Sequence, residues 1–204
     1  MSIGINSTLS PEIIEQALSY GSYNRRVNEL YARNETTSGD NREVMLQYTR
    51  LNLQRTNRIE KRGSIIPEAR VAVKANKAAQ IWLVITEGWC GDSAQILPYL
   101  NKMSDLNPRI SLKIVLRDEQ PELMDKFLTN GSRSIPKLIV LEAETLEVLA
   151  EWGPRPKEAQ NLYVAERSDA EIGAKKADQN LHLWYAKDKG KSTQHEIAEL
   201  LNRL

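Results

Sequence analysis

The feature that most constrains the fold of this chain is an unbroken apolar run, Ile81 to Ile85, with the chain's single cysteine, Cys90, five residues later. Continuous apolar runs are typical of strands that are buried on both faces of a sheet. A helical pattern that contains Pro98 begins directly after the cysteine. The pattern therefore predicts a buried strand that delivers a thiol to a helix N-terminus, where the helix dipole lowers the thiol pKa.

A second feature lies 46 residues after the cysteine, where Ile135-Pro136 precedes another apolar run. Proline at the opening of a strand fits a cis peptide bond, which is rare and usually serves a tight geometry. The thiol and this proline together point to thiol chemistry.

The other elements of the central region follow from apolar runs and turn signals. Strands are predicted over 112–116, 137–141 and 146–152, with a short helix over 121–128. The last two strands are close enough in sequence to form a hairpin around residues 142–145. Alternation of strand and helix in the first part predicts parallel pairing through right-handed crossovers.

The regions on either side of this centre read as helical. A helix should start at Pro11, with Ser10 as its cap, and Gly21 could interrupt it. A second helix should run from about Asn41 to Arg62. After the strands, further helices are predicted over 157–168, then up to Gly190, and then from a capping box at Thr193–Glu196.

Bulk composition excludes several classes of protein. Of 204 residues 41% are hydrophobic and 27% charged, as in ordinary globular proteins, and the net charge of +1 gives no reason to expect nucleic acid or an anionic membrane. The longest strictly apolar run has five residues, and residues 1–10 show no secretory signal. One cysteine excludes an intramolecular disulfide and a cysteine-rich metal site, so we expect no metal and a reducing cytoplasm.

Over about residues 78–170 the chain resembles the thioredoxin superfamily. The resemblance rests on the order of elements, on Trp89-Cys90-Gly91 with Pro98 eight residues after the cysteine, and on Ile135-Pro136. Four short sequence segments resemble one bacterial thioredoxin-like family that has a helical N-terminal extension. These segments are residues 86–92, 117–119, 133–136 and 152–156. The resemblance implies an α/β, three-layer fold around a mixed four-stranded sheet. The predicted parts are a helical extension over 1–77, the thioredoxin-like domain over 78–170, and C-terminal helices over 171–204.

The chain departs from thioredoxins at two positions. Ser93 stands where they have a second, resolving cysteine, and Val84 stands where they have a buried Asp that helps to move protons. A dithiol cycle within one chain is therefore unavailable. The resemblance implies a monothiol thiol-disulfide oxidoreductase, in which Cys90 reacts with a protein disulfide or a small thiol such as glutathione, and an external thiol resolves the adduct.

A rival interpretation is a non-catalytic module that uses the same groove to bind a peptide or an anionic ligand, with Cys90 as a small buried hydrophobe. The candidate catalytic residues are Cys90, Ser93 and Pro136. Ser93 could stabilise a thiolate or simply cap the helix. Pro136 could leave the preceding backbone free to pair with a bound peptide or glutathione, or could serve turn geometry alone.

Topology suggests which side chains surround the thiol, because the predicted strands bring Arg117, Arg133 and Arg155 to the sheet edge that carries Cys90. Three arginines there could favour a thiolate and bind a carboxylate or phosphate; alternatively they form solvated ion pairs with nearby acids. Tryptophan side chains could add an apolar rim or belong to the core. The other predicted substrate-binding residues are Trp89, Gly91, Asp92, Ile135 and Trp152.

The thiol pKa is expected to reflect a contest between two charges. The helix N-terminus favours the thiolate by roughly 0.3–1 kcal/mol, up to ~2 when partly buried. Repulsion from Asp92 opposes it by about 0.6–2.4 kcal/mol, so nearby cations should decide the outcome. Elsewhere, His182 and His195 are expected at the surface, and the basic residues of 50–62 on a solvated helix face.

Overall fold

A mixed four-stranded sheet lies at the centre of the computed structural model, which describes residues 8–204. Its strand order is β2-β1-β3-β4. Strand β1 (Gln80–Thr86) pairs in parallel with β2 (Ile110–Leu116) and antiparallel with β3 (Lys137–Glu142), and β3 pairs antiparallel with β4 (Val148–Trp152). The predicted α/β architecture with a mixed sheet is therefore confirmed.

The sequence of β1 reflects its central place, since every residue of the strand is buried. Trp82 and Val84 belong to the larger hydrophobic core on one face of the sheet, while Leu83 and Ile85 belong to a smaller core on the other face. Side chains alternate along a strand, so only a continuous apolar run can fill both cores.

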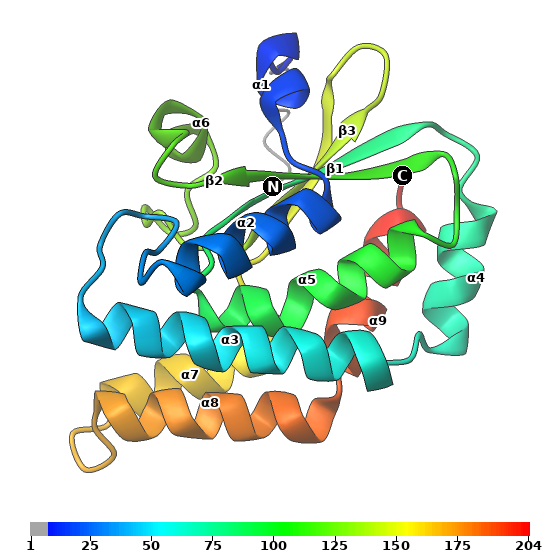
Figure 1. Cartoon of the computed structure of the whole chain (residues 1–204). Helices are drawn as coiled ribbons and strands as arrows, with labels where there is room; N and C mark the ends of the chain where they lie inside the picture. Colours follow the sequence, from blue (N-terminus) through cyan, green and yellow to red (C-terminus); the bar gives the residue numbers. More distant parts are fainter. Residues whose placement is uncertain (1–7) are drawn as a thin grey trace.

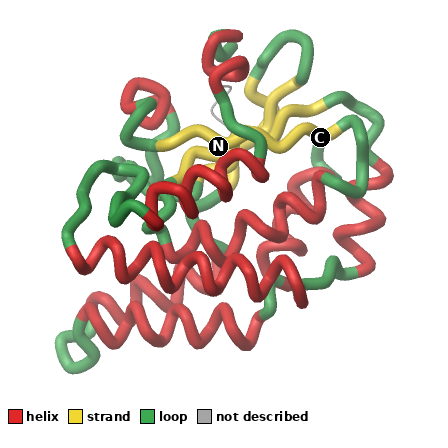
Figure 2. The backbone as a smooth tube through the Cα atoms, in the orientation of Figure 1, coloured by secondary structure: helices red, strands yellow, loops and turns green. Residues whose placement is uncertain are grey.

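Helices cover both faces of the sheet, most of them on one side (Figures 1 and 2). The short helices α1 and α6 lie on the side of the smaller core, and the remaining helices lie on the opposite side. The helices are α1 (Pro11–Gln16), α2 (Tyr20–Ala32), α3 (Glu43–Arg62), α4 (Pro67–Ala75), α5 (Gly91–Ser104), α6 (Pro121–Lys126), α7 (Lys157–Ser168), α8 (Ala174–Asp188) and α9 (Lys191–Leu201).

The helix predicted from Pro11 is interrupted at a different residue from the one expected. It divides into α1 and α2 around Leu18, and Gly21 lies inside α2. Leu18 forms an isolated antiparallel bridge with Ile114 of β2, with two backbone hydrogen bonds of 2.8 Å. Pairing with the edge of the sheet therefore replaces helical hydrogen bonds at this residue. The first seven residues of the predicted extension lie outside the described residues.

The capping box predicted at Thr193 is wrong, because α9 begins two residues earlier after Gly190, whose φ is 75°. Thr193 and Gln194 are buried inside the helix instead. The Glu196 carboxylate accepts hydrogen bonds of 2.7 Å from the Trp152 indole and from the backbone N–H of Lys157. Helix α4, which sequence analysis did not predict, packs against α9. Among the described residues, no helix combines the length and apolar character needed to cross a membrane.

The packing of α9 predicts that the C-terminal helices unfold together with the sheet. Ile197 is fully buried in the larger core, so Ile197→Ala should lower the free energy of unfolding by about 2–5 kcal/mol in urea denaturation. Val164→Ala on the exposed face of α7 is the matched control and should change it by less than about 0.5 kcal/mol. A separate early transition for α9 would contradict this single cooperative unit.

Candidate thiol site

Cys90 is the N-cap residue of α5 and is 7% exposed. Its Sγ donates a hydrogen bond of 3.4 Å to the carbonyl oxygen of Ile135. The Ile135–Pro136 peptide bond is cis, and so is Gly153–Pro154, which the sequence analysis did not single out. The strand order therefore brings the cysteine and the proline segment together, because β3 starts at the sheet edge where β1 ends.

Residues of the N-terminal region hold the loop that precedes the cysteine. Asn52 of α3 donates a hydrogen bond of 3.1 Å to the carbonyl oxygen of Gly88, and the N–H of Gly88 donates one of 3.0 Å to Thr37 Oγ1. The Thr37 hydroxyl in turn donates to Glu87, which also accepts a bond of 3.0 Å from the N–H of Asp118. Burial raises the pKa of the Glu87 carboxyl, and these donors oppose that rise.

Asp92, two residues after the cysteine, forms a buried ion pair with Arg155. Its Oδ2 lies 2.8 Å from Nη2 and 2.9 Å from Nε of the arginine. Its Oδ1 accepts a hydrogen bond of 2.7 Å from the Tyr185 hydroxyl of α8. Arg155 also lies over the Tyr163 ring, 4.2 Å from its centre. Burial raises the pKa of Asp92, while the charge and hydrogen bonds of Arg155 lower it.

The other two predicted arginines pair with acids other than Asp92. Arg117 Nε lies 2.7 Å from Asp118, and its guanidinium lies 4.9 Å from the centre of the Trp89 ring. Arg133 lies 2.6 Å from Asp125 in an exposed pair. Each of the three arginines therefore has an acidic partner, and none is an unpaired cation at the sulfur. Arg155 is bonded to Asp92, two residues after Cys90.

The thiol itself is held neutral. Burial, and then the charge of Asp92, raises the pKa of Cys90 to about 11, although hydrogen bonding from Ser93 favours the thiolate. The sequence-based expectation weighed only the helix dipole against the charge of Asp92. Desolvation of the buried thiol has a larger effect on its pKa than either charge. Ser93 Oγ accepts a hydrogen bond of 2.6 Å from Thr86, which leaves its own hydroxyl hydrogen free for another acceptor.

A cleft of about 1040 Å³ opens beside Cys90, and most of the predicted site residues line it. Three do not: Ser93 and Pro136 are buried off the lining, and the Trp152 indole bonds to Glu196 and packs against the larger core. The predicted residues on the lining are Trp89, Cys90, Gly91, Asp92, Arg117, Arg133, Ile135 and Arg155.

Sequence analysis missed the cleft residues that come from α3 and α8. His182 is half-buried rather than at the surface, and a Cβ atom on Gly91 would lie only 2.6 Å from its ring. Burial, with Arg55 and Arg155 nearby, lowers the pKa of His182 to about 4, so the ring is neutral at pH 7. Leu181 and Tyr185, one residue before and three residues after His182, are buried. Their helical spacing places His182 next to the buried face of α8, and this pattern could have indicated its inward position. His195 is exposed, as expected.

Arg55 also differs from expectation. It lines the cleft half-buried instead of lying on a solvated helix face. Within residues 8–204, no group of three or more His, Cys, Asp and Glu side chains is arranged to hold a metal ion.

Comparison with known proteins agrees with this geometry. The thioredoxin family model matches residues 39–173, about two thirds of the chain, so the chain belongs to the thioredoxin family. No curated protein matches it.

Two solved structures share the fold at low sequence identity. A protein of unknown function from Pseudomonas aeruginosa is 16% identical with a TM-score of 0.55, and the match covers 91% of this chain and 98% of that one. An HIV epitope scaffold is 17% identical with a TM-score of 0.54, covering 92% and 99%. At these identities the likeness establishes the fold alone.

The first prediction for the site concerns the thiol. With a pKa of about 11, the rate of iodoacetamide alkylation of the native protein should rise about tenfold per pH unit from pH 7 to 9 without reaching a plateau. The urea-unfolded chain is the control, and its rate should level off above about pH 8.5. A plateau near pH 8.5 in the native protein would show that burial does not govern the thiol.

The second concerns the ion pair. Replacing Arg155 by Met leaves the Asp92 carboxylate buried with one hydroxyl donor, which should lower the free energy of unfolding by about 3–5 kcal/mol in urea denaturation. Adding Asp92→Asn to this variant should recover part of the loss, because no charge remains buried. Arg133→Met, which breaks the exposed pair with Asp125, is the matched control and should be nearly neutral. Equal effects of the two arginine replacements would refute a special role for the buried pair.

Proposed function

We propose that this protein carries out monothiol thiol-disulfide exchange through Cys90. The observation that carries the proposal is the position of Sγ, at the N-terminus of α5, on the lining of a large cleft and 3.4 Å from the carbonyl oxygen that precedes Pro136. A thiol placed between a helix N-terminus and an extended segment can receive a partner that pairs with that segment.

The proposed reaction has two exchange steps. Cys90 loses its proton to solvent, its sulfur bonds to one sulfur of a disulfide, and the S–S bond of that disulfide breaks. The departing sulfur takes up a proton and leaves as a thiol. An external thiol then attacks the mixed disulfide, forms a new disulfide with the partner's sulfur, and restores the Cys90 thiol. The proposed partners are a protein disulfide or a small thiol, with glutathione or another small thiol as co-substrate in a reducing cytoplasm.

The neutral thiol limits how fast the free protein can react. At pH 7 a pKa of about 11 leaves about one thiolate in ten thousand molecules, and only the thiolate attacks a disulfide. We propose that a bound disulfide displaces the Ile135 carbonyl oxygen from its hydrogen bond with Cys90 Sγ. The Ser93 hydroxyl would then stabilise the developing thiolate.

A second candidate function also fits the burial of Cys90. A cysteine that stays protonated can serve as a small apolar side chain in a non-catalytic binding module. In this second function the cleft binds a ligand but Cys90 takes part in no exchange reaction. An assay of mixed-disulfide formation at Cys90 therefore distinguishes the two functions.

The proposal predicts a stable adduct, because no second cysteine can resolve it. Incubation with oxidised glutathione at pH 8 should add one glutathione per chain, measured by intact mass, and dithiothreitol should remove it. Cys90→Ala should take up none. Insulin reduction should be slow unless a small thiol is supplied.

A further variant keeps the test informative. Ser93→Ala should slow adduct formation, because it removes the hydroxyl that favours the thiolate. Failure of the native protein to form any adduct, while the urea-unfolded chain does, would favour the binding module instead. Rapid insulin reduction without added thiol would contradict the monothiol cycle.

A further inference from the structure

Arg55 is a half-buried cation without a carboxylate partner. Within residues 8–204, its guanidinium makes one hydrogen bond, of 2.8 Å, to the side-chain oxygen of Asn52. The nearby Asp92 is already bonded to Arg155. Burial of a guanidinium costs free energy unless an anion compensates it. A cation in this state on the wall of a cleft indicates a site for an anion that comes from outside the chain.

The position of Arg55 connects that site to the thiol. A Cβ atom on Gly91 would lie 3.5 Å from Nη1, so the guanidinium lies beside the residue that follows Cys90. Both Arg55 and Cys90 line the cleft. An anion bound by Arg55 would therefore lie close to the sulfur.

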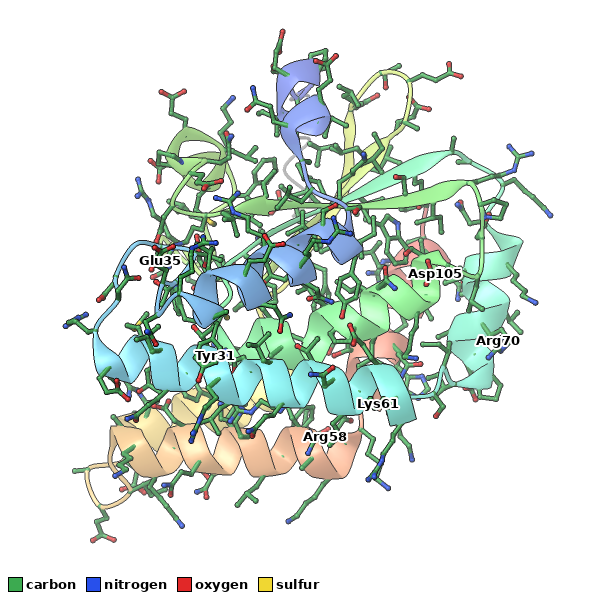
Figure 3. The ribbon with its side chains drawn as sticks, viewed as in Figure 1. Tyr31, Glu35, Arg58, Lys61, Arg70 and Asp105 are labelled. Atoms are coloured by element: carbon green, nitrogen blue, oxygen red, sulfur yellow. The ribbon has the colours of Figure 1, made fainter. Side chains whose placement is uncertain are left out.

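The rest of the lining is mainly basic. Six basic and two acidic side chains line the cleft, and three of the basic ones are paired with acids. Arg55, Arg58 of α3 and Lys175 of α8 make no ion pair within the described residues. Against them stands one lining acid that is outside such pairs among the described residues, Asp178. Figure 3 shows Arg58 on the side of α3 that faces α8, so the two helices carry cations toward the same space.

We propose that the cleft binds small anionic disulfides, with Arg55 as the residue that binds their carboxylate and positions the S–S bond at Cys90. This inference rests on the exchange activity proposed above and names its substrate class. Arginine suits the role because its planar fork accepts a carboxylate through two hydrogen bonds. Residues of both α3 and α8 line the cleft beside Cys90, which favours a small molecule that lies between them over a folded protein partner.

The test compares three small disulfides that differ mainly in charge: dithiodipropionate, a dianion; hydroxyethyl disulfide, which is neutral; and cystamine, a dication. In each case Cys90 forms a mixed disulfide with half of the reagent and releases the other half as a thiol. Each rate of adduct formation, measured by intact mass, is divided by the rate of the same reagent with N-acetylcysteine amide. This normalisation removes differences in intrinsic reactivity.

The normalised rate should fall in the order dianion, neutral, dication, and the order should weaken in 1 M salt as the charges are screened. Arg55→Gln should reduce the advantage of the dianion by at least about tenfold, the size expected for loss of a charge-assisted hydrogen bond. Arg55→Lys should restore part of it through charge alone. Arg50→Gln is the control, because Arg50 belongs to the same helix, is exposed and does not line the cleft.

The outcomes separate the two proposals. Equal normalised rates for the three reagents, or equal effects of Arg55→Gln and Arg50→Gln, would overturn the anionic substrate class and leave exchange itself standing. No adduct with any of the three reagents would overturn exchange, and the substrate class with it. Charge ordering that survives in Arg55→Gln would place the anion site elsewhere and refute the role of Arg55.

Discussion

The buried ion pair between Asp92 and Arg155 is the interaction on which the arrangement of the site depends. It joins the first turn of α5 to the segment after β4, and the Tyr185 hydroxyl adds α8 to the same carboxylate. A carboxylate that is 6% exposed requires such partners, because an uncompensated charge in this place would be costly. Helix α8 therefore contributes to the polar centre of the site as well as to the lining of the cleft.

The same pair determines what the charges near the thiol can do. Arg155 could have favoured a thiolate, but its charge is engaged by Asp92, and the Asp92 charge raises the thiol pKa. Burial then governs the thiol, which stays protonated and donates to the carbonyl oxygen of Ile135. Cations without an ion-pair partner, such as Arg55, also line the cleft, where they can act on a bound ligand.

Local patterns were enough to predict the framework and part of the site. Apolar patterns located all four strands, and the predicted strand order placed Pro136 beside Cys90. Long-range contacts were beyond such patterns. The bridge of Leu18 to Ile114 and the inward position of His182 depend on which elements become neighbours in space. Desolvation of the thiol was missed because burial of a loop residue depends on the helices that cover it.

Thr37 and Glu87 show that the N-terminal region and the thiol loop are chemically interdependent. Glu87 is fully buried, and its carboxylate is compensated by the Thr37 hydroxyl and one backbone N–H. Exchange of residues 8–77 for an unrelated segment would leave that acid with a single hydrogen-bond donor. In a lineage of such proteins the two segments would have to be inherited together, so shuffling of domains at this boundary would be selected against.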